Sequence, residues 1–489
     1  MAIRRYKATA DNTIANGYQE NLGTRATGSN TGQADVSEVY SIYGRATTSS
    51  AEVSRILTQF DVTSISSDRT AGVVPASGSV SFYLRLYNAE TSKTVARNFD
   101  LVVSAVSRSW TEGDGLDLEN YKDIGKSNWI SASSTVAWTT EGGDYHALPV
   151  FEQNFETGLE DLEIDVTSLV EQWIAGTKTN YGFGIQLTSS QEASSSTNLV
   201  GATSSYYTKR FFARGTQYFF KKPVIEARWN SSTQDDRGDF YYSSSLSPAG
   251  DNLNTLYLYN FVRGQLTNIP DIGTGAIYVD LYSGSADDTA PSGSTLVQSI
   301  STPATGGYVS TGIYSCSVCI TAAATPISTL YDVWYSGSTQ YFTGTVKPTV
   351  LRALGASTGN NRRIAKIKNL RAKYFSEEEA RFNVFVRNKN WSPTIYTVAS
   401  SVVENTIIPS ASYRVYRVLD GLNVIPHGTG SDLQTILSYD VSGNYFNLDM
   451  SLLEPGYEYG IKLAFYDSQR QSWIEQDQKF LFRVEDYEY

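Results

Sequence analysis

The sequence predicts an all-β protein: an N-terminal jelly-roll sandwich followed by two immunoglobulin-like β-sandwich domains. Short runs alternate apolar and polar residues between Gly, Ser, Asp and Pro, most clearly at residues 80–87, 276–282 and 413–418. A period of two residues is typical of a strand with one buried face. The composition agrees, because 34 Tyr and 38 Gly stand against two Met and two His, a balance that favours strands over helices.

The first domain is expected to cover residues 1–230. The stretches 54–65 and 165–185 mark its antiparallel sandwich, and residues 219–229 have the pattern of a closing strand. Residues 231–238 are polar and have the composition of a linker. We therefore place the first domain boundary near residue 230.

One helix is predicted within this domain, over residues 167–174. Its apolar residues have helical spacing, and Gly176 follows it as a stop signal. Asp165 or Thr167 provides the side chain that caps its N-terminus.

Two further β-sandwich domains are expected, at residues 231–354 and 364–489. The segment 355–363 interrupts the strand pattern between them. Each domain is about 120 residues long, which suits a sandwich of about seven strands. The middle domain is a spacer or a docking surface, and the last is expected to dock on a larger particle or to be displayed from it.

The net charge and the hydropathy of the sequence limit the classes of partner that this protein is expected to bind. The net charge is −11 and the pI is near 4.9, so neither nucleic acid nor an anionic membrane surface is expected to attract this protein. Residues 8–13 are polar where a signal peptide would be apolar, and no run has the roughly 18 apolar residues of a membrane span. We expect no signal peptide, no membrane span, and a protein or a sugar as partner.

The N-terminal domain resembles a known family. Six elements occur in the family's order, at residues 10–14, 54–61, 82–87, 110–112, 165–173 and 180–182. Together they are similar to the DNRLRE-type domain, over about residues 8–230. The resemblance implies an extracellular jelly roll related to carbohydrate-binding modules. The family usually follows a secretion leader, whereas this chain shows none.

The C-terminal domain carries a second resemblance. Residues 382–396, 439–450 and 479–485 are similar to β-sandwich modules in structural proteins of tailed phages. This resemblance implies a non-enzymatic virion component, assembled in the host cytoplasm, that docks on the capsid, neck or tail and braces or projects from the particle. Its partners would be other virion proteins, in a homo-oligomer or multi-copy assembly. The alternative is a carbohydrate-binding adhesin or receptor-binding module that recognises surface glycans.

Three tryptophans are the candidates for glycan binding. Trp110, Trp129 and Trp138 lie in the first domain, and a flat indole face can cover the apolar side of a sugar ring. Tryptophans in a domain of this size more often belong to the core. Their exposure therefore decides between a sugar platform and a packing role.

An acidic loop is the candidate for a metal ion. Glu112, Asp114, Asp117 and Glu119 bring four carboxylates into eight residues, and calcium prefers several oxygen ligands. The spacing does not match an EF-hand loop. A solvated loop is the favoured interpretation, with structural calcium as the alternative, and no other cofactor is expected.

Catalytic residues are scarce in this sequence. His146 and His427 are the two histidines and fall in different predicted domains, so no histidine-dependent triad is expected. The sequence contains none of the usual nucleophile, phosphate-loop or zinc-protease motifs. A hydrolase based on a carboxylate pair stays open, but the favoured prediction is a protein that is not an enzyme.

Arg55 is expected to have a structural role in the first domain. It lies in an alternating strand, and a guanidinium pairs well with a planar carboxylate. Its predicted partner is a carboxylate such as Asp61 or Asp165.

Overall fold

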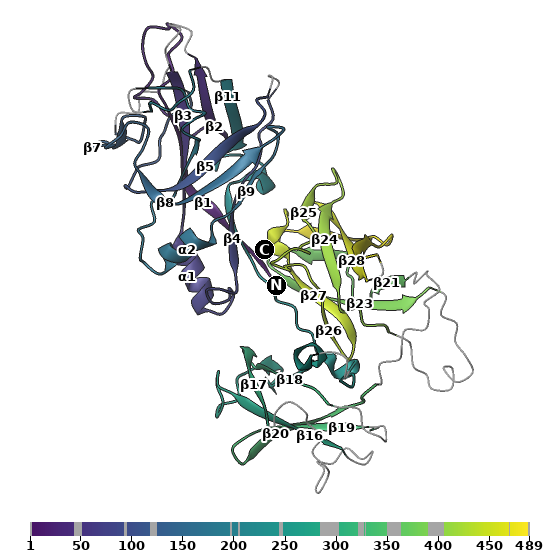
Figure 1. Cartoon of the computed structure of the whole chain (residues 1–489). Coiled ribbons are helices and arrows are strands. Elements are labelled where there is room, and N and C mark those ends of the chain that lie inside the picture. Colours follow the sequence, from purple (N-terminus) through teal and green to yellow (C-terminus); the bar gives the residue numbers. More distant parts are fainter. Residues whose placement is uncertain are drawn as a thin grey trace. The chain divides into compact units, whose positions relative to one another are not determined.

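A computed structural model gives the fold for most of the chain. It describes residues 2–43, 51–91, 95–117, 125–195, 198–203, 206–243, 248–283, 303–320, 327, 329–349, 363–389, 405–468 and 470–487. These residues form an all-β protein with sandwich-like sheets (Figure 1). The chain divides into two compact units, Ala2–Asn230 and Ser231–Tyr489. The predicted linker at 355–363 falls outside the described residues except for Arg363.

The first unit is organised by one long strand, β1 (Ile3–Ala15). A bulge between Ala8 and Ala10 bends β1, so that its first half pairs with β12 and its second half with β3. One strand therefore belongs to both layers. The strand order is β9-β4-β12-β1 in one layer and β1-β3-β10-β5-β8 in the other, with β2 pairing β3 and β11.

The strands paired in this unit are β2 (Val36–Tyr43), β3 (Ala51–Phe60), β4 (Ser81–Leu86), β5 (Phe99–Val106), β8 (Tyr145–Phe155), β9 (Leu162–Asp165), β10 (Phe183–Leu187), β11 (Tyr206–Phe212) and β12 (Val224–Arg228), with the short pair β6 (Ser131–Ser133) and β7 (Val136–Ala137). The alternating burial of β4, in which Phe82, Leu84 and Leu86 are buried, shows why this sequence forms a strand with one face on the core. Phe99 and Phe155 stack in that core at 5.3 Å between ring centroids.

Two α-helices close one part of this core. The predicted helix is confirmed as α2 (Thr167–Ile174), which buries Leu169, Val170 and Trp173. The carboxylate of Asp165 accepts the backbone N–H of Thr167 at 2.9 Å.

Helix α1 (Val62–Thr70) was not predicted. It carries a single buried side chain, Ile65, so its sequence has no amphipathic pattern. Its N-terminus is nevertheless well marked, because Asp61 accepts hydrogen bonds from the backbone N–H of Thr63 and from the hydroxyl of Ser64.

The second unit begins with a six-stranded sheet in the order β13-β18-β17-β16-β19-β20. Its strands are β13 (Asn254–Tyr259), β16 (Ile277–Ser283), β17 (Ala304–Ser310), β18 (Ile313–Val318), β19 (Leu330–Ser336) and β20 (Thr339–Val346), and a separate hairpin joins β14 (Phe261–Val262) and β15 (Gln265–Leu266). The two edge strands β13 and β20 both contact the 3-10 helix η2 (Asp236–Gly238). The sheet is therefore curled, and η2 lies at its seam.

Two more sheets follow in this unit. One has the order β21-β23-β27-β26 and the other β22-β30-β28-β24-β25, with β29 paired to β28. Their strands are β21 (Arg363–Ile367), β22 (Lys373–Phe375), β23 (Glu379–Asn388), β24 (Ala411–Arg417), β25 (Asn423–Ile425), β26 (Ser438–Asp440), β27 (Gly443–Asp449), β28 (Glu458–Asp467), β29 (Ser472–Glu475) and β30 (Phe480–Glu485). Tyr413 of β24 stacks on Phe446 of β27 with ring centroids 4.1 Å apart. Aromatic rings thus join the two sheets face to face, as in a β-sandwich.

In the part of the chain that the structure describes, no helix combines the length and the apolar character needed to cross a bilayer.

The cap of α1 provides a test of the fold. Replacing Asp61 with Ala removes the acceptor for the Thr63 N–H, and we expect the unfolding free energy to fall by about 1 kcal/mol. Urea denaturation followed by circular dichroism measures the change. Ser67→Ala, at an exposed position of the same helix, is the control. Equal stability of the two variants would contradict the assigned cap.

Candidate functional site

The three predicted glycan-binding tryptophans are buried. Trp110, Trp129 and Trp138 expose 8%, 6% and 6% of their surfaces and belong to a second hydrophobic cluster of the first unit. Two of the indole N–H groups donate internally, from Trp110 to the Tyr181 carbonyl and from Trp138 to the Asn128 carbonyl, each at 2.8 Å. The exposed faces that a sugar platform requires are therefore missing at these residues, which form part of a core.

The acidic loop is tied into ion pairs. Both carboxylate oxygens of Glu112 accept from the Arg214 guanidinium at 2.9 Å. Asp114 lies 3.1 Å from the Lys126 ammonium. Asp117 is the third described carboxylate of the loop. Among the described residues, no three or more His, Cys, Asp and Glu side chains are arranged to hold a metal ion. Glu119 lies outside the described residues. Within the described part of this loop, Glu112 and Asp114 are therefore engaged in ion pairs.

Arg55 forms the expected bidentate pair, but with a different carboxylate. Its guanidinium donates to both oxygens of Glu192, at 2.9 and 2.8 Å. The predicted partners are occupied elsewhere, since Asp61 caps α1 and Asp165 receives the first N–H of α2. The predicted partners were wrong because the fold, and not the position in the chain, decides which distant carboxylate lies beside Arg55.

A serine, a histidine and a carboxylate do come together in the second unit. The hydroxyl of Ser412 lies 3.0 Å from Nδ1 of His427, and Nε2 of His427 lies 3.5 Å from Glu475. Ser412 is completely buried and also bonds to Thr435. Glu475 is paired with Arg414 and Lys462. A substrate cannot reach this hydroxyl, so the group acts as a packed polar network between strands.

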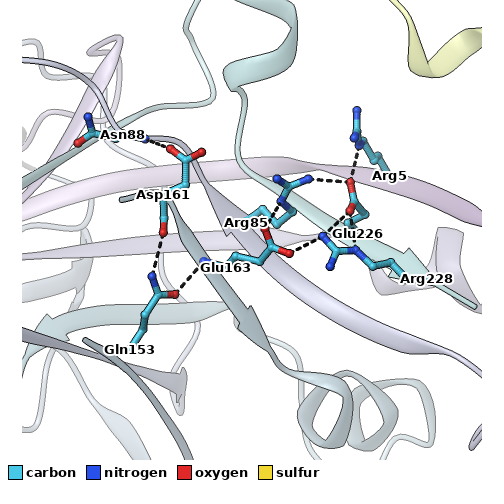
Figure 2. Close-up of polar contacts among 8 residues, drawn as sticks. All are labelled: Arg5, Arg85, Asn88, Gln153, Asp161, Glu163, Glu226 and Arg228. Carbon is cyan, nitrogen blue, oxygen red and sulfur yellow. Dashed lines mark hydrogen bonds and ion pairs between the residues drawn. The ribbon is translucent and has the colours of Figure 1, made fainter. Parts of the chain in front are cut away.

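A charged cluster of the first unit lies on β1, β4, β9 and β12, and Figure 2 shows it. We call it the arginine layer: it comprises Arg5, Arg85, Arg228, Glu163 and Glu226. Glu226 is at its centre. Its carboxylate lies 2.6 Å from Arg5, 3.1 Å from Arg85 and 2.7 Å from Arg228.

The charge of Glu226 in the arginine layer is set by its three arginine neighbours against the effect of burial. Glu226 exposes only 2% of its surface. Burial by itself would raise the pKa of Glu226, but the guanidinium groups of Arg5, Arg85 and Arg228 outweigh it and hold the pKa well below its usual range. The carboxylate is therefore ionised, and it ties three strands together by charge as well as by backbone hydrogen bonds.

A second charged cluster lies at the seam of the curled sheet in the second unit. Arg237 of η2 donates to both oxygens of Asp332, at 2.7 and 2.6 Å. Asp332 is fully buried and also accepts from the Trp334 indole at 2.7 Å. Gly344 leaves the space for this pair, because a Cβ there would collide with the Arg237 guanidinium and the Asp332 carboxylate.

The segment just before Arg237 pairs with a different sheet of the same unit. The N–H of Asp235 donates to the Tyr439 carbonyl, and the N–H of Tyr439 donates to the Thr233 carbonyl. The Tyr439 hydroxyl donates to Asp236 at 2.7 Å. Residues 233–239, which we call the joint, therefore extend the sheet that contains β26 while η2 locks the curled sheet. The predicted linker is a structured connection.

The arginine layer can be tested by removing its central charge. Glu226→Gln leaves three guanidinium groups around a neutral amide, and we expect the unfolding free energy to fall by about 3 kcal/mol. Because the folded pKa of Glu226 is depressed, the wild-type contribution is present above the ordinary glutamate pKa and is lost only as the pH falls through the lower folded value. Urea denaturation at neutral pH measures the loss. Glu152→Gln, at an exposed position of β8, should change little, and an equal loss in both variants would refute the role of Glu226.

In the joint, the ionisation of Asp235 should affect the free energy of unfolding in the opposite direction to that of Glu226. Burial raises the pKa of Asp235 to about 6, so its ionisation opposes folding once the pH exceeds the unfolded value near 4. Asn at this position keeps the acceptor for the Arg237 N–H and cannot ionise. We expect Asp235→Asn to be more stable than wild type by about 3 kcal/mol at pH 7 and nearly equal to it at about pH 4. Urea unfolding at both pH values measures this. A variant less stable at neutral pH would show that the charge is needed.

Comparison with known proteins adds little to this geometry. No family model matches the chain, and no curated protein matches it. Among solved structures, matches include the N-terminal Ig1-2 module of the Drosophila receptor protein tyrosine phosphatase DLAR, at 7% identity and a TM-score of 0.15 over 48% of this chain and 91% of that one. Tandem Ig repeats of Dlar match at 8% identity and a TM-score of 0.14, with the same coverage of each chain. TM-scores this low carry no argument about fold or function.

Proposed function

We propose that this protein is a non-enzymatic structural component of a tailed-phage virion. It would act as a head decoration, neck or tail-associated protein that docks on the particle and braces or projects from it. The observation that carries the proposal is the joint at residues 233–239, in which a buried ion pair and a strand extension connect two successive β-sheet structures. A protein that transmits force between its parts needs such fixed connections.

Bending the joint has a high free-energy cost. Moving η2 away from the curled sheet would separate Arg237 from the fully buried Asp332, and an uncompensated buried charge costs about 3 to 5 kcal/mol. The backbone hydrogen bonds between residues 233–235 and Tyr439 would break as well. The loss of the ion pair and the loss of these backbone hydrogen bonds both oppose rotation at the joint, which favours a stiff structural role.

The first unit fits this role as a display or docking module. Its two layers, joined by the shared strand β1, support the jelly-roll interpretation that the resemblance to DNRLRE-type domains implies. Interior ion pairs such as the arginine layer set the register of neighbouring strands, because shifting one strand would separate the charges. We propose that such modules occur in several copies on a particle, with other virion proteins as partners.

The alternative function is a glycan-binding adhesin, and the feature of the sequence that suggested it was a platform of exposed tryptophans. The predicted platform required exposed indoles at Trp110, Trp129 and Trp138, and all three are packed in a core. A structural role needs no such face.

The test is association with particles. We expect the protein to remain with phage particles through gradient purification at a fixed copy number, and antibodies against it to label one place on each particle. Quantitative mass spectrometry and electron microscopy of labelled particles measure these outcomes. Absence of the protein from purified particles would overturn the proposal, and so would glycan binding by a protein that never associates with a virion.

A further inference from the structure

Lys209 of the first unit is buried, and no carboxylate of the described residues hydrogen-bonds to its ammonium. Lys209 of β11 exposes 2% of its surface. Its Nζ donates to the side-chain oxygen of Asn88 at 2.7 Å and to the carbonyls of Gly158 and Glu160 at 2.9 and 2.7 Å. All three acceptors are neutral amide oxygens. Neutral acceptors compensate a buried ammonium less well than a carboxylate would, so much of the free-energy cost of removing this charge from water remains.

The three acceptors and the two aromatic rings beside Lys209 stabilise the ammonium, and burial is what favours the neutral amine. The rings of Phe155 and Phe211, both fully buried, have their centroids 4.9 and 5.1 Å from Nζ. Burial lowers the pKa of Lys209 to about 8, although the charges of Glu160 and Asp161 oppose the shift. The lowered pKa raises the fraction of molecules that carry a neutral amine near neutral pH. A neutral amine is a nucleophile, and the atom it touches belongs to a carboxamide.

The carboxamide of Asn88 is held in place from its backbone. Figure 2 shows Asn88 beside Asp161, whose carboxylate accepts the Asn88 N–H at 2.7 Å. Asn88 also forms a β-bridge with Phe211, two residues beyond Lys209. Both reacting side chains are thus fixed on neighbouring backbones, which is the arrangement that accelerates reactions between two groups of one molecule.

We propose that Lys209 and Asn88 form an intramolecular isopeptide bond. The lone pair of the neutral Nζ attacks Cγ of Asn88 and forms a new C–N bond. The bond from Cγ to the side-chain nitrogen then breaks, Nζ gives up one proton, and the leaving nitrogen gains one and departs as ammonia. The reaction exchanges one amide for another, so it needs neither an oxidant nor an energy source.

Glu160 is the residue that the structure assigns to the proton transfer. Its backbone carbonyl already holds Nζ, and its carboxylate acts electrostatically on Lys209. Oε2 of Glu160 is buried, and no hydrogen-bond partner for it occurs among the described residues. Oε1 of Glu160 accepts from Thr157, and these hydrogen bonds lower the pKa of the carboxyl to about 2 despite its desolvation. The other oxygen, Oε2, is the one that can relay the proton from Nζ to the leaving nitrogen without keeping it.

The bond would join parts of the first unit that are distant in sequence. Asn88 follows β4, and Lys209 lies 121 residues later on β11. Cross-linking residues this far apart restricts the unfolded chain and resists mechanical extension. This inference is independent of the place that the protein occupies on a particle.

The decisive measurement is the intact mass of the denatured full-length protein. We expect the wild-type mass to be lower than the sequence mass by one ammonia, and a tryptic digest to contain a branched peptide that joins Asn88 to Lys209. Lys209→Arg and Asn88→Ala should both have the full sequence mass. The matched control is Lys462→Arg, which changes a buried lysine that contacts the Glu475 carboxylate, and this variant should still lack one ammonia.

The wild-type protein alone can overturn the proposal, so the result does not depend on the folding of a variant. A full sequence mass after prolonged incubation at about pH 9, where the Lys209 amine is mostly neutral, would exclude the bond. Loss of ammonia that persists in both Lys209→Arg and Asn88→Ala would exclude this pair of residues. For Glu160→Gln we expect bond formation at least tenfold slower. A wild-type rate in that variant would remove Glu160 from the proton transfer.

Discussion

The second unit depends on the ion pair between Arg237 and Asp332. A curled sheet has two edge strands, and unpaired edges invite other chains to add to them. Here η2 reaches both β13 and β20, and the guanidinium bonds to a carboxylate that has no contact with water. Arg237 begins a sequence that spells an integrin-binding tripeptide, Arg-Gly-Asp. In the structure this arginine is committed to the sheet, and its role is to close the seam.

The first unit uses charge in the same way. Its β-layers carry buried or half-buried carboxylates and guanidinium groups where strands meet, in the arginine layer and in the pair of Arg55 with Glu192. Such pairs give specificity more than net stability, because desolvation offsets most of their attraction. A sheet shifted by one residue would turn these charges toward the core or away from their partners. Directional pairs therefore suit a protein whose modules must have one defined shape.

Local features of the fold could be predicted where they depend on neighbours in the chain. The helix at 167–174 was predicted because its apolar spacing and its flanking Asp165 and Gly176 are local signals. Helix α1 was missed because only Ile65 is buried on it, so tertiary contacts and a cap maintain it without an apolar stripe. The prediction of the partner of Arg55 was wrong because that contact is not local. Glu192 becomes adjacent to Arg55 only when the fold places β3 beside a distant loop.

By itself the sequence determined that this is an all-β protein with alternating strands, a negative net charge and few catalytic side chains, since these properties depend on composition and on a period of two residues. Only the tertiary structure decided which side chains meet. It placed Trp110, Trp129 and Trp138 in a core, made the polar residues 233–239 into a joint, and brought Lys209 to Asn88. The reason is physical: in a β-protein most contacts join strands that are far apart in the chain, so burial and pairing follow from topology.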